Sequence, residues 1–136
     1  MSEILFGFDY GLKYIGLSVG ENITCKARPL KTLLAKNGIP DWYILDNLVL
    51  SWNPCKIIVG VPYINDINIL YFCLRKFIKK IKFRYNLPVY EINEDYTTWV
   101  AKHYFLNYKH NKNFIKINSL SATIILDSFF KNNQII

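Results

Sequence analysis

The chain has 136 residues, about the commonest length of a single domain, which excludes two ordinary domains and predicts one domain over residues 1–136. Apolar residues make up 51% of the chain and charged residues 20%, a balance that excludes a disordered or fibrous protein. The net charge of +7 predicts a polyanionic partner, nucleic acid first, although the excess is mostly lysine in a chain rich in Ile, Lys and Asn.

The first third of the sequence predicts three antiparallel strands. Ile4 to Asp9 alternates and favours a strand, a turn follows over residues 10–13, and Ile15 to Gly20 returns as the hairpin partner. Ile23 to Pro29 predicts the third strand. We expect it to end at Pro29, because proline cannot donate a hydrogen bond to a neighbouring strand.

The rest of the chain alternates between helical and strand patterns. Apolar residues at helical spacing, with capping residues before them, predict four helices and two more strands. The first two helices are predicted from an Asp41 cap to about Ser51 and from Asn65 or Asp66 to about Tyr85, and the two strands over Lys56 to Val61 and Pro88 to Ile92. A third helix from Tyr96 to about Leu106 is followed by a polar loop over Tyr108 to Lys116. The last helix is predicted from Ser119 to about Lys131, capped by Asn118, with Leu120, Ile124, Ile125 and Phe129 facing the core. This order predicts an α/β fold with a mixed five-stranded sheet and helices on both faces.

Two classes of protein are disfavoured. No apolar run reaches the roughly 20 residues of a membrane span, and the first residues lack the basic segment of a secretory signal, so we expect a soluble cytoplasmic protein without a membrane partner. The three cysteines are scattered and form no CxxC pair. With His103 and His110 far away in the sequence, they do not have the spacing of zinc ligands.

Two carboxylates follow predicted strands, where an acid is held at the edge of a sheet. Asp9 lies between a strand and the turn at Gly11, and Glu94 comes just after the strand that ends near Ile92. Such acids suit a divalent cation. Taken singly, each has a structural alternative, because Asp9 could cap turn amides and the carboxylates around Glu94 could favour the start of a helix.

In combination the motifs resemble the YqgF/RuvX family from end to end. The matching segments are Phe8 to Gly16 (FDYGLKYIG) with Val19-Gly20, Ala27-Arg28-Pro29, Pro40-Asp41-Trp42, Trp52-Asn53-Pro54, Ile57 to Pro62 (IIVGVP), Asn93 to Thr98, and Lys116 to Ala122 (KINSLSA) with Ile124 to Leu126. Each segment alone is unspecific, but together they follow the family in register over nearly the whole chain.

The resemblance implies a ribonuclease H-like fold related to Holliday-junction resolvases, and a nuclease that matures the end of pre-16S ribosomal RNA. The implied chemistry is metal-assisted phosphodiester hydrolysis, in which carboxylates hold two Mg²⁺ or Mn²⁺ ions roughly 4 Å apart. Asp9 and Glu94 match two of the family's acids and are the expected catalytic metal ligands. Asn118 stands where the family places a third acid. An amide oxygen ligates Mg²⁺ without supplying charge, so we expect a weakened third ligand and lower metal affinity.

Further positions bear on contacts with nucleic acid. Lys13 and Arg28 match family positions and are expected to contact phosphates. Beside Glu94 the chain has Asn93 and Asp95 where the family has Asp and Arg, and the missing arginine is expected to weaken a phosphate contact.

Three functions remain open at this point. The leading hypothesis is a Mg²⁺-dependent endonuclease of structured RNA, with precursor ribosomal RNA as its partner. The second is a catalytically weakened RNA-binding protein of the same fold. The third is a Holliday-junction resolvase acting on DNA, which would need a dimer, whereas we expect a monomer or weak homodimer.

Overall fold

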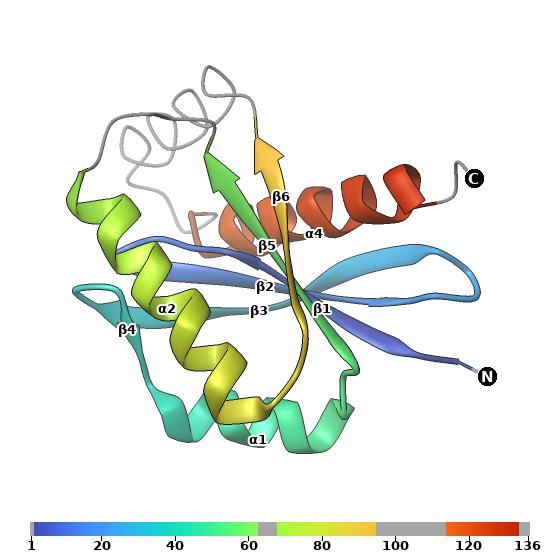
Figure 1. The fold of residues 1–136 in the computed structure, drawn as a ribbon, viewed down its shortest axis with the longest axis horizontal. Coiled ribbons are helices and arrows are strands. Elements are labelled where there is room, and N and C mark those ends of the chain that lie inside the picture. Colours follow the sequence, from blue (N-terminus) through green and yellow to red (C-terminus); the bar gives the residue numbers. More distant parts are fainter. Residues whose placement is uncertain (1, 63–67, 95–113, 134–136) are drawn as a thin grey trace.

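The computed structural model describes residues 2–62, 68–94 and 114–133 (Figure 1). Its elements in chain order are β1 (Ile4–Asp9), β2 (Tyr14–Glu21), β3 (Lys26–Lys36), β4 (Ile39–Pro40), α1 (Trp42–Trp52), β5 (Lys56–Pro62), α2 (Ile69–Tyr85), β6 (Val89–Glu94) and α4 (Phe114–Asn133). The predicted helix from Tyr96 and most of the predicted polar loop lie outside the described residues. Within the described residues, no helix combines the length and the apolarity that crossing a bilayer takes.

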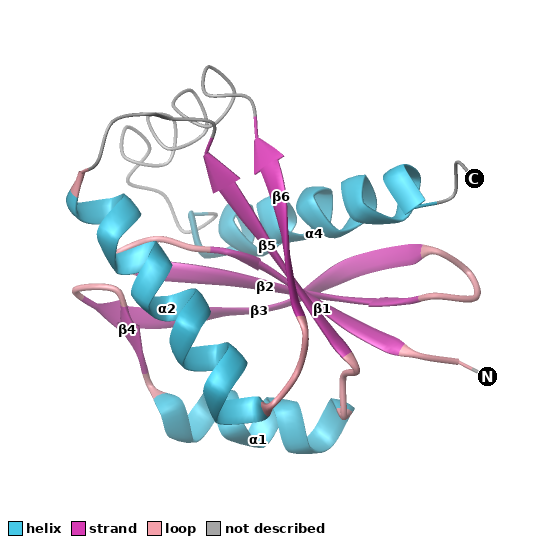
Figure 2. Ribbon diagram, in the orientation of Figure 1, coloured by secondary structure: helices cyan, strands magenta, loops and turns pink. Residues whose placement is uncertain are grey.

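The strands form one mixed sheet in the order β4-β3-β2-β1-β5-β6 (Figure 2). The first four are joined by antiparallel pairings, whereas β1, β5 and β6 run parallel to one another. The predicted mixed α/β sheet is therefore confirmed. The prediction of five strands missed only β4, which has two residues and pairs with the end of β3.

The third strand is longer than predicted, because Pro29 lies inside it. Pro29 pairs with Ser18 at a shift of register between Leu17 and Ser18, where one strand holds an extra residue. A bulge is one of the few places where a strand tolerates proline, since the ladder is already interrupted there. The expected end at Pro29 was therefore wrong, and the strand continues to Lys36.

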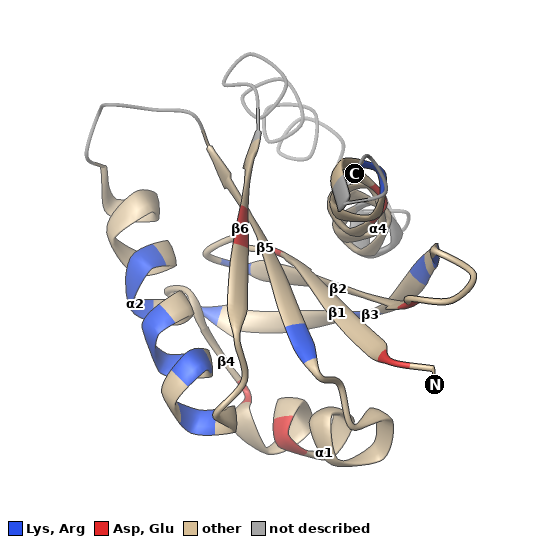
Figure 3. Ribbon diagram, turned by 45° about the vertical axis from the view of Figure 1, so that its right-hand side comes forward, with Lys and Arg blue, Asp and Glu red and all other residues tan. Residues whose placement is uncertain are grey.

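The helices cover both faces of the sheet (Figure 3). On one face, residues of α1 and α2 such as Leu45 and Phe77 pack against Phe6 and Phe8 of β1. On the other face, α4 packs against Leu5 and its neighbours. The alternation of side chains along β1 thus supplies a core to each layer.

The ends of α1 agree with the prediction, and the start of α2 does not. Asp41 caps α1 by accepting a hydrogen bond from the amide of Tyr43, and Asn53 ends the helix in the left-handed conformation at φ 48°. The α2 helix begins at Ile69, because the Asn68 side chain accepts from the amide of Tyr71 at 2.8 Å and so caps it. The proposed caps at residues 65 and 66 lie outside the described residues.

The last helix begins earlier than predicted, and its buried face is only partly the predicted one. It starts at Phe114, since residues 114–117 include no helix breaker, so Asn118 lies inside the helix and does not cap it. Leu120 and Ile124 were expected inward but are 50% and 63% exposed. Ile125 is buried and Phe129 packs beside it, as predicted. The side that meets the sheet also carries Asn118, Ala122, Leu126 and Phe130.

Candidate active site

The candidate site is built around Asp9, the last residue of β1. Asp9 is only 3% exposed. Side chains alternate along a strand, so Asp9 shares its face with Leu5 and Gly7, the face that α4 covers. A carboxylate at this position is held rigidly at the end of a central strand and is largely shielded from solvent.

Gly16 brings the last helix against this strand end. Gly16 is the cross-strand partner of Asp9. A Cβ atom added to Gly16 would lie 2.0 Å from the carbonyl oxygen of Asn118, a separation that real Cβ atoms do not reach. Asn118 is 5% exposed. The absence of a side chain at Gly16 therefore lets α4 place Asn118 within one strand of Asp9.

The contact between α4 and β2 continues along the same face. Ser18, which is fully buried, donates a hydrogen bond from its hydroxyl to the carbonyl oxygen of Ala122 at 2.8 Å. A Cβ atom added to Gly20 would meet side-chain atoms of Phe130 and Leu126 at 2.8 and 2.9 Å. Three small residues at alternate positions of β2 therefore let α4 lie close to this strand, and Gly16 is the one that meets the backbone of Asn118.

Thr32 is a candidate that the sequence did not indicate. It is half-buried and pairs with Gly16, so Asp9, Gly16 and Thr32 lie in line across three strands. Directly opposite residues of an antiparallel sheet share a face. Only the register reveals this alignment, because Thr32 is distant from Asp9 in sequence and belongs to no motif.

Glu94 ends at the same edge of the sheet as Asp9. It is the last residue of β6, where its backbone pairs with Pro62 of β5. The prediction had placed Glu94 after the strand, but pairing with β5 extends β6 by two residues beyond Ile92. Since β5 separates β6 from β1, and Glu94 stands two residues beyond the level of Asp9, their backbones lie about 12 Å apart. The structure describes the backbone of Glu94 but not its side chain.

The two predicted phosphate contacts are placed differently. Lys13 is exposed in the turn between β1 and β2, at the Asp9 edge, and its carbonyl accepts a hydrogen bond from Ala35. Arg28 pairs with Val19, part way towards the opposite edge, and its guanidinium lies 5.1 Å from the ring centre of Trp52 in α1. The structure thus brings Lys13 to the site edge and places Arg28 away from it, on the other face.

The residue types of the candidate site, two carboxylates and an amide at Asp9, Glu94 and Asn118, suit a hard divalent cation. Carboxylate and amide oxygens are what Mg²⁺ and Mn²⁺ prefer. Within the described residues, no group of three His, Cys, Asp or Glu side chains lies close enough to hold a metal.

Solved structures that resemble this chain include Holliday-junction resolvases. The RuvC of T. thermophilus in complex with a Holliday junction superposes with a TM-score of 0.57 at 16% identity, over 97% of this chain and 96% of that one. The Fowlpox virus resolvase bound to Holliday junction DNA gives a TM-score of 0.52 at 15% identity, over 96% of this chain and 98% of that one. The fold is therefore the ribonuclease H-like fold of the resolvases, as the sequence predicted.

Comparison of sequences identifies the family within that class. The profile of the family described as RuvX, Holliday junction resolvase, matches residues 3–132. A protein of Legionella pneumophila strain Philadelphia 1, named "Putative pre-16S rRNA nuclease", is 36% identical over 96% of this chain and 97% of its own length. A protein of the same name from Pseudomonas fluorescens is 46% identical over 74% of this chain and 70% of its own length. The chain belongs to the RuvX family, a family of nucleases.

Proposed function

We propose that this protein is a metal-dependent endonuclease that hydrolyses phosphodiester bonds of structured RNA in the cytoplasm, with precursor 16S ribosomal RNA as its substrate. The observation that carries the proposal is the buried carboxylate of Asp9 at the sheet edge, with Asn118 held one strand away through Gly16. The substrate is suggested by the names of the relatives, and the net charge of +7 favours a polyanion.

Three residues of the chain would hold the metal. Asp9 would supply a full negative charge from a rigid position, and Asn118 an amide oxygen without charge. Glu94 would supply the second carboxylate, since strand alternation gives position 94 the face of Ile92, which packs in the cluster beside α4. Bound divalent ions supply a water that is deprotonated near neutral pH and stabilise the leaving oxygen.

Two basic side chains, Lys13 and Arg28, would position the RNA. Lys13 is exposed at the Asp9 edge and would contact a phosphate close to the scissile bond. Arg28, which is exposed beside Trp52, would contact the backbone further away.

Asn118 also favours a second function of a different class. With Asn118 in place of an acid, the proposed metal site would have one negative charge fewer than the resemblance implies for the family, so metal affinity and activity would be reduced. In the limit the protein would bind RNA through its basic surface without hydrolysing it.

Cleavage of a pre-ribosomal RNA fragment by wild type and Asn118→Asp, over a range of Mg²⁺ and Mn²⁺ concentrations, tests the proposal. RNA binding is followed in parallel at fixed salt. A nuclease predicts cleavage by wild type, with Asn118→Asp active at lower metal concentration. A binding protein predicts an inert wild type that binds RNA, with activity appearing only in Asn118→Asp. Absence of both binding and cleavage in both proteins would contradict the proposed function.

A further inference from the structure

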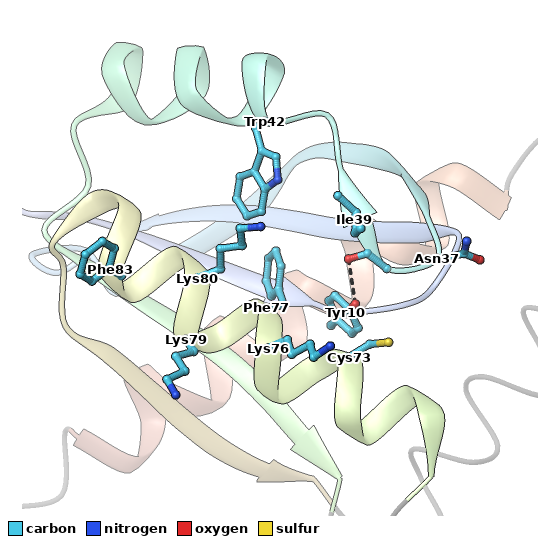
Figure 4. A pocket seen from close by; sticks show the side chains of 11 residues that line it. Tyr10, Asn37, Ile39, Trp42, Cys73, Lys76, Phe77, Lys79, Lys80 and Phe83 are labelled. Atoms are coloured by element: carbon cyan, nitrogen blue, oxygen red, sulfur yellow. Dashed lines mark hydrogen bonds between the residues drawn. The ribbon is translucent and has the colours of Figure 1, made fainter.

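A pocket of about 590 Å³ lies on the face of the sheet opposite α4, between α2, the start of α1 and the β3–β4 turn (Figure 4). This volume is within the range of small-ligand sites. The lining residues are Tyr10, Asn37, Gly38, Ile39, Trp42, Cys73, Lys76, Phe77, Lys79, Lys80 and Phe83. None of them belongs to the candidate active site.

The walls of this pocket are aromatic and largely fixed. Phe77 forms the inner wall, with its ring centre 4.9 Å from that of Tyr10 and 6.3 Å from that of Trp42, nearly parallel to the latter at 21°. The hydroxyl of Tyr10 donates to the carbonyl of Gly38 at 2.8 Å and anchors the β3–β4 turn. Burial raises the pKa of Tyr10, so this hydroxyl stays protonated as the donor. At the outer end Phe83 is 91% exposed.

Three lysines of α2 line one side of the pocket, and no acid is among the described residues that line it. The Lys80 ammonium lies 5.7 Å from the ring centre of Trp42, close enough for a cation–π contact that holds it beside the aromatic wall. Among the described residues the ion pairs of α2 are made by its arginines, with Glu91 and Asp46, and none by its lysines. The charges of Lys76, Lys79 and Lys80 are therefore available to an anionic ligand, and α2 is the most basic helix in view (Figure 3).

Phe77 and Tyr10 are 3% and 4% exposed and form the buried floor, so the ring open to a ligand is that of Phe83. An exposed aromatic ring beside lysines that make no ion pair with the described residues matches the chemistry of one ligand class, a nucleobase with its flanking phosphates. Stacking on aromatic side chains and charge contacts to the backbone are how proteins bind single strands. The bases of a duplex are stacked and paired, so only an unpaired base can enter such a pocket. An acidic peptide satisfies the lysines but makes less use of the flat, exposed ring of Phe83.

The pocket is also well placed for a strand that reaches the active site. Tyr10 directly follows Asp9, and alternation puts the two residues on opposite faces of the same strand end. From Cys73 to Phe83 the pocket follows α2 for about 15 Å, at 1.5 Å per residue. We propose that this pocket binds an unpaired nucleotide in a single-stranded flank of the RNA, a proposal that rests on the proposed function.

The test compares a labelled RNA hairpin with the same hairpin carrying a flank of unpaired uridines, in EDTA to prevent cleavage. Fluorescence anisotropy at fixed salt should show that the flank tightens binding to wild type by about tenfold, which corresponds to about 1.4 kcal/mol. Phe83→Ala should remove this gain. Phe72→Ala is the matched control, because Phe72 is an exposed phenylalanine of the same helix outside the pocket and should keep the gain.

A second pair of variants tests the charge. Lys80→Gln should lower the salt dependence of binding to the flanked hairpin by about 0.7 in the logarithmic slope, the value for one phosphate of a single strand. Lys82→Gln, an exposed lysine of α2 outside the pocket, should leave that slope nearly unchanged.

The outcomes separate the pocket from the proposed function. The hairpin without a flank reports RNA binding, and the increment from the flank reports the pocket. A wild type that binds the hairpin but gains nothing from the flank, or an equal loss in Phe83→Ala and Phe72→Ala, overturns the pocket assignment and leaves the proposed function standing. A flank that is bound through Phe83 while the hairpin is not supports the pocket and counts against structured RNA as substrate. The assignment is also overturned if the flank gives no gain and an acidic, phenylalanine-containing peptide displaces the RNA from wild type but not from Phe83→Ala. That result would identify a protein partner for the pocket.

Discussion

Substituting Gly16 tests how the active site is assembled. In Gly16→Ala the new methyl group would lie 2.0 Å from the carbonyl oxygen of Asn118, about 1.4 Å short of ordinary contact, which begins near 3.4 Å. The obstructing atom is backbone in the interior of a helix, so it cannot swing aside as a side chain can. The helix α4 must move away from β2 as a body. Overpacking costs about 1–3 kcal/mol, and we expect the upper end, about 3 kcal/mol of unfolding free energy.

The same movement separates Asn118 from Asp9. A misplacement of about 1 Å in a catalytic site can cost about 100-fold in rate, and we expect a loss of that order. Urea denaturation measures the free energy of unfolding. Single-turnover cleavage of the RNA fragment, under conditions where the variant is folded, measures the loss of activity separately.

Gly20→Ala is the matched control, because Gly20 lies on the same strand and face, four residues further from the site. Its new methyl group meets side-chain atoms of Phe130 and Leu126 at 2.8 and 2.9 Å and a backbone oxygen at 3.0 Å, all further away than the Asn118 oxygen is from Gly16. We expect a smaller loss of stability and nearly unchanged activity. The reasoning would be refuted if Gly16→Ala kept its stability and rate, or if both variants lost activity equally.

Three further predictions follow from named contacts. Ser18→Ala should lower the unfolding free energy by about 1 kcal/mol, because it removes the buried hydrogen bond to Ala122; a urea midpoint equal to that of wild type would contradict this. Hydrogen bonds from Arg84 hold the pKa of Asp46 at about 2, below its unfolded value near 4, so this carboxylate stabilises the fold above about pH 4 and loses that contribution as pH falls towards 2. The stability difference between wild type and Asp46→Asn should therefore shrink over this range in acid denaturation, and a pH-independent difference would argue against the pair. Lys13→Gln should reduce the salt dependence of RNA binding by about one phosphate contact, whereas an unchanged slope would remove Lys13 from the interface.

The order of elements could be predicted from the sequence because the signals were local. The alternation of Ile4 to Asp9, the apolar run of β5 and the Asp41 cap each depend on a few adjacent residues. The prediction that the third strand ends at Pro29 was wrong for the same reason. It applied a local rule for proline, whereas a bulge in the pairing of β3 with β2 accommodates the proline. Likewise, Leu120 and Ile124 fit an apolar stripe, yet the face of α4 that contacts the glycines of β2 carries Asn118, Leu126 and Phe130.

The candidate site could be predicted only in part. Asp9 and Asn118 were identified by their match to family motifs, and the structure places both in buried positions on adjacent elements. The contact of Gly16 with Asn118 and the alignment of Thr32 with Asp9 depend on strand register and helix approach. Residues far apart in a sequence carry no local sign that they will meet, so no pattern in a single sequence could indicate these contacts.

The central claim is that Asp9 is a metal ligand of a phosphodiester-hydrolysing site. The most direct measurement is Mg²⁺- and Mn²⁺-dependent cleavage of a pre-ribosomal RNA fragment by wild type and by Asp9→Asn, with RNA binding measured on the same preparations. The account predicts that cleavage by wild type disappears in Asp9→Asn while RNA binding stays nearly intact. Cleavage by Asp9→Asn at the wild-type rate would contradict it.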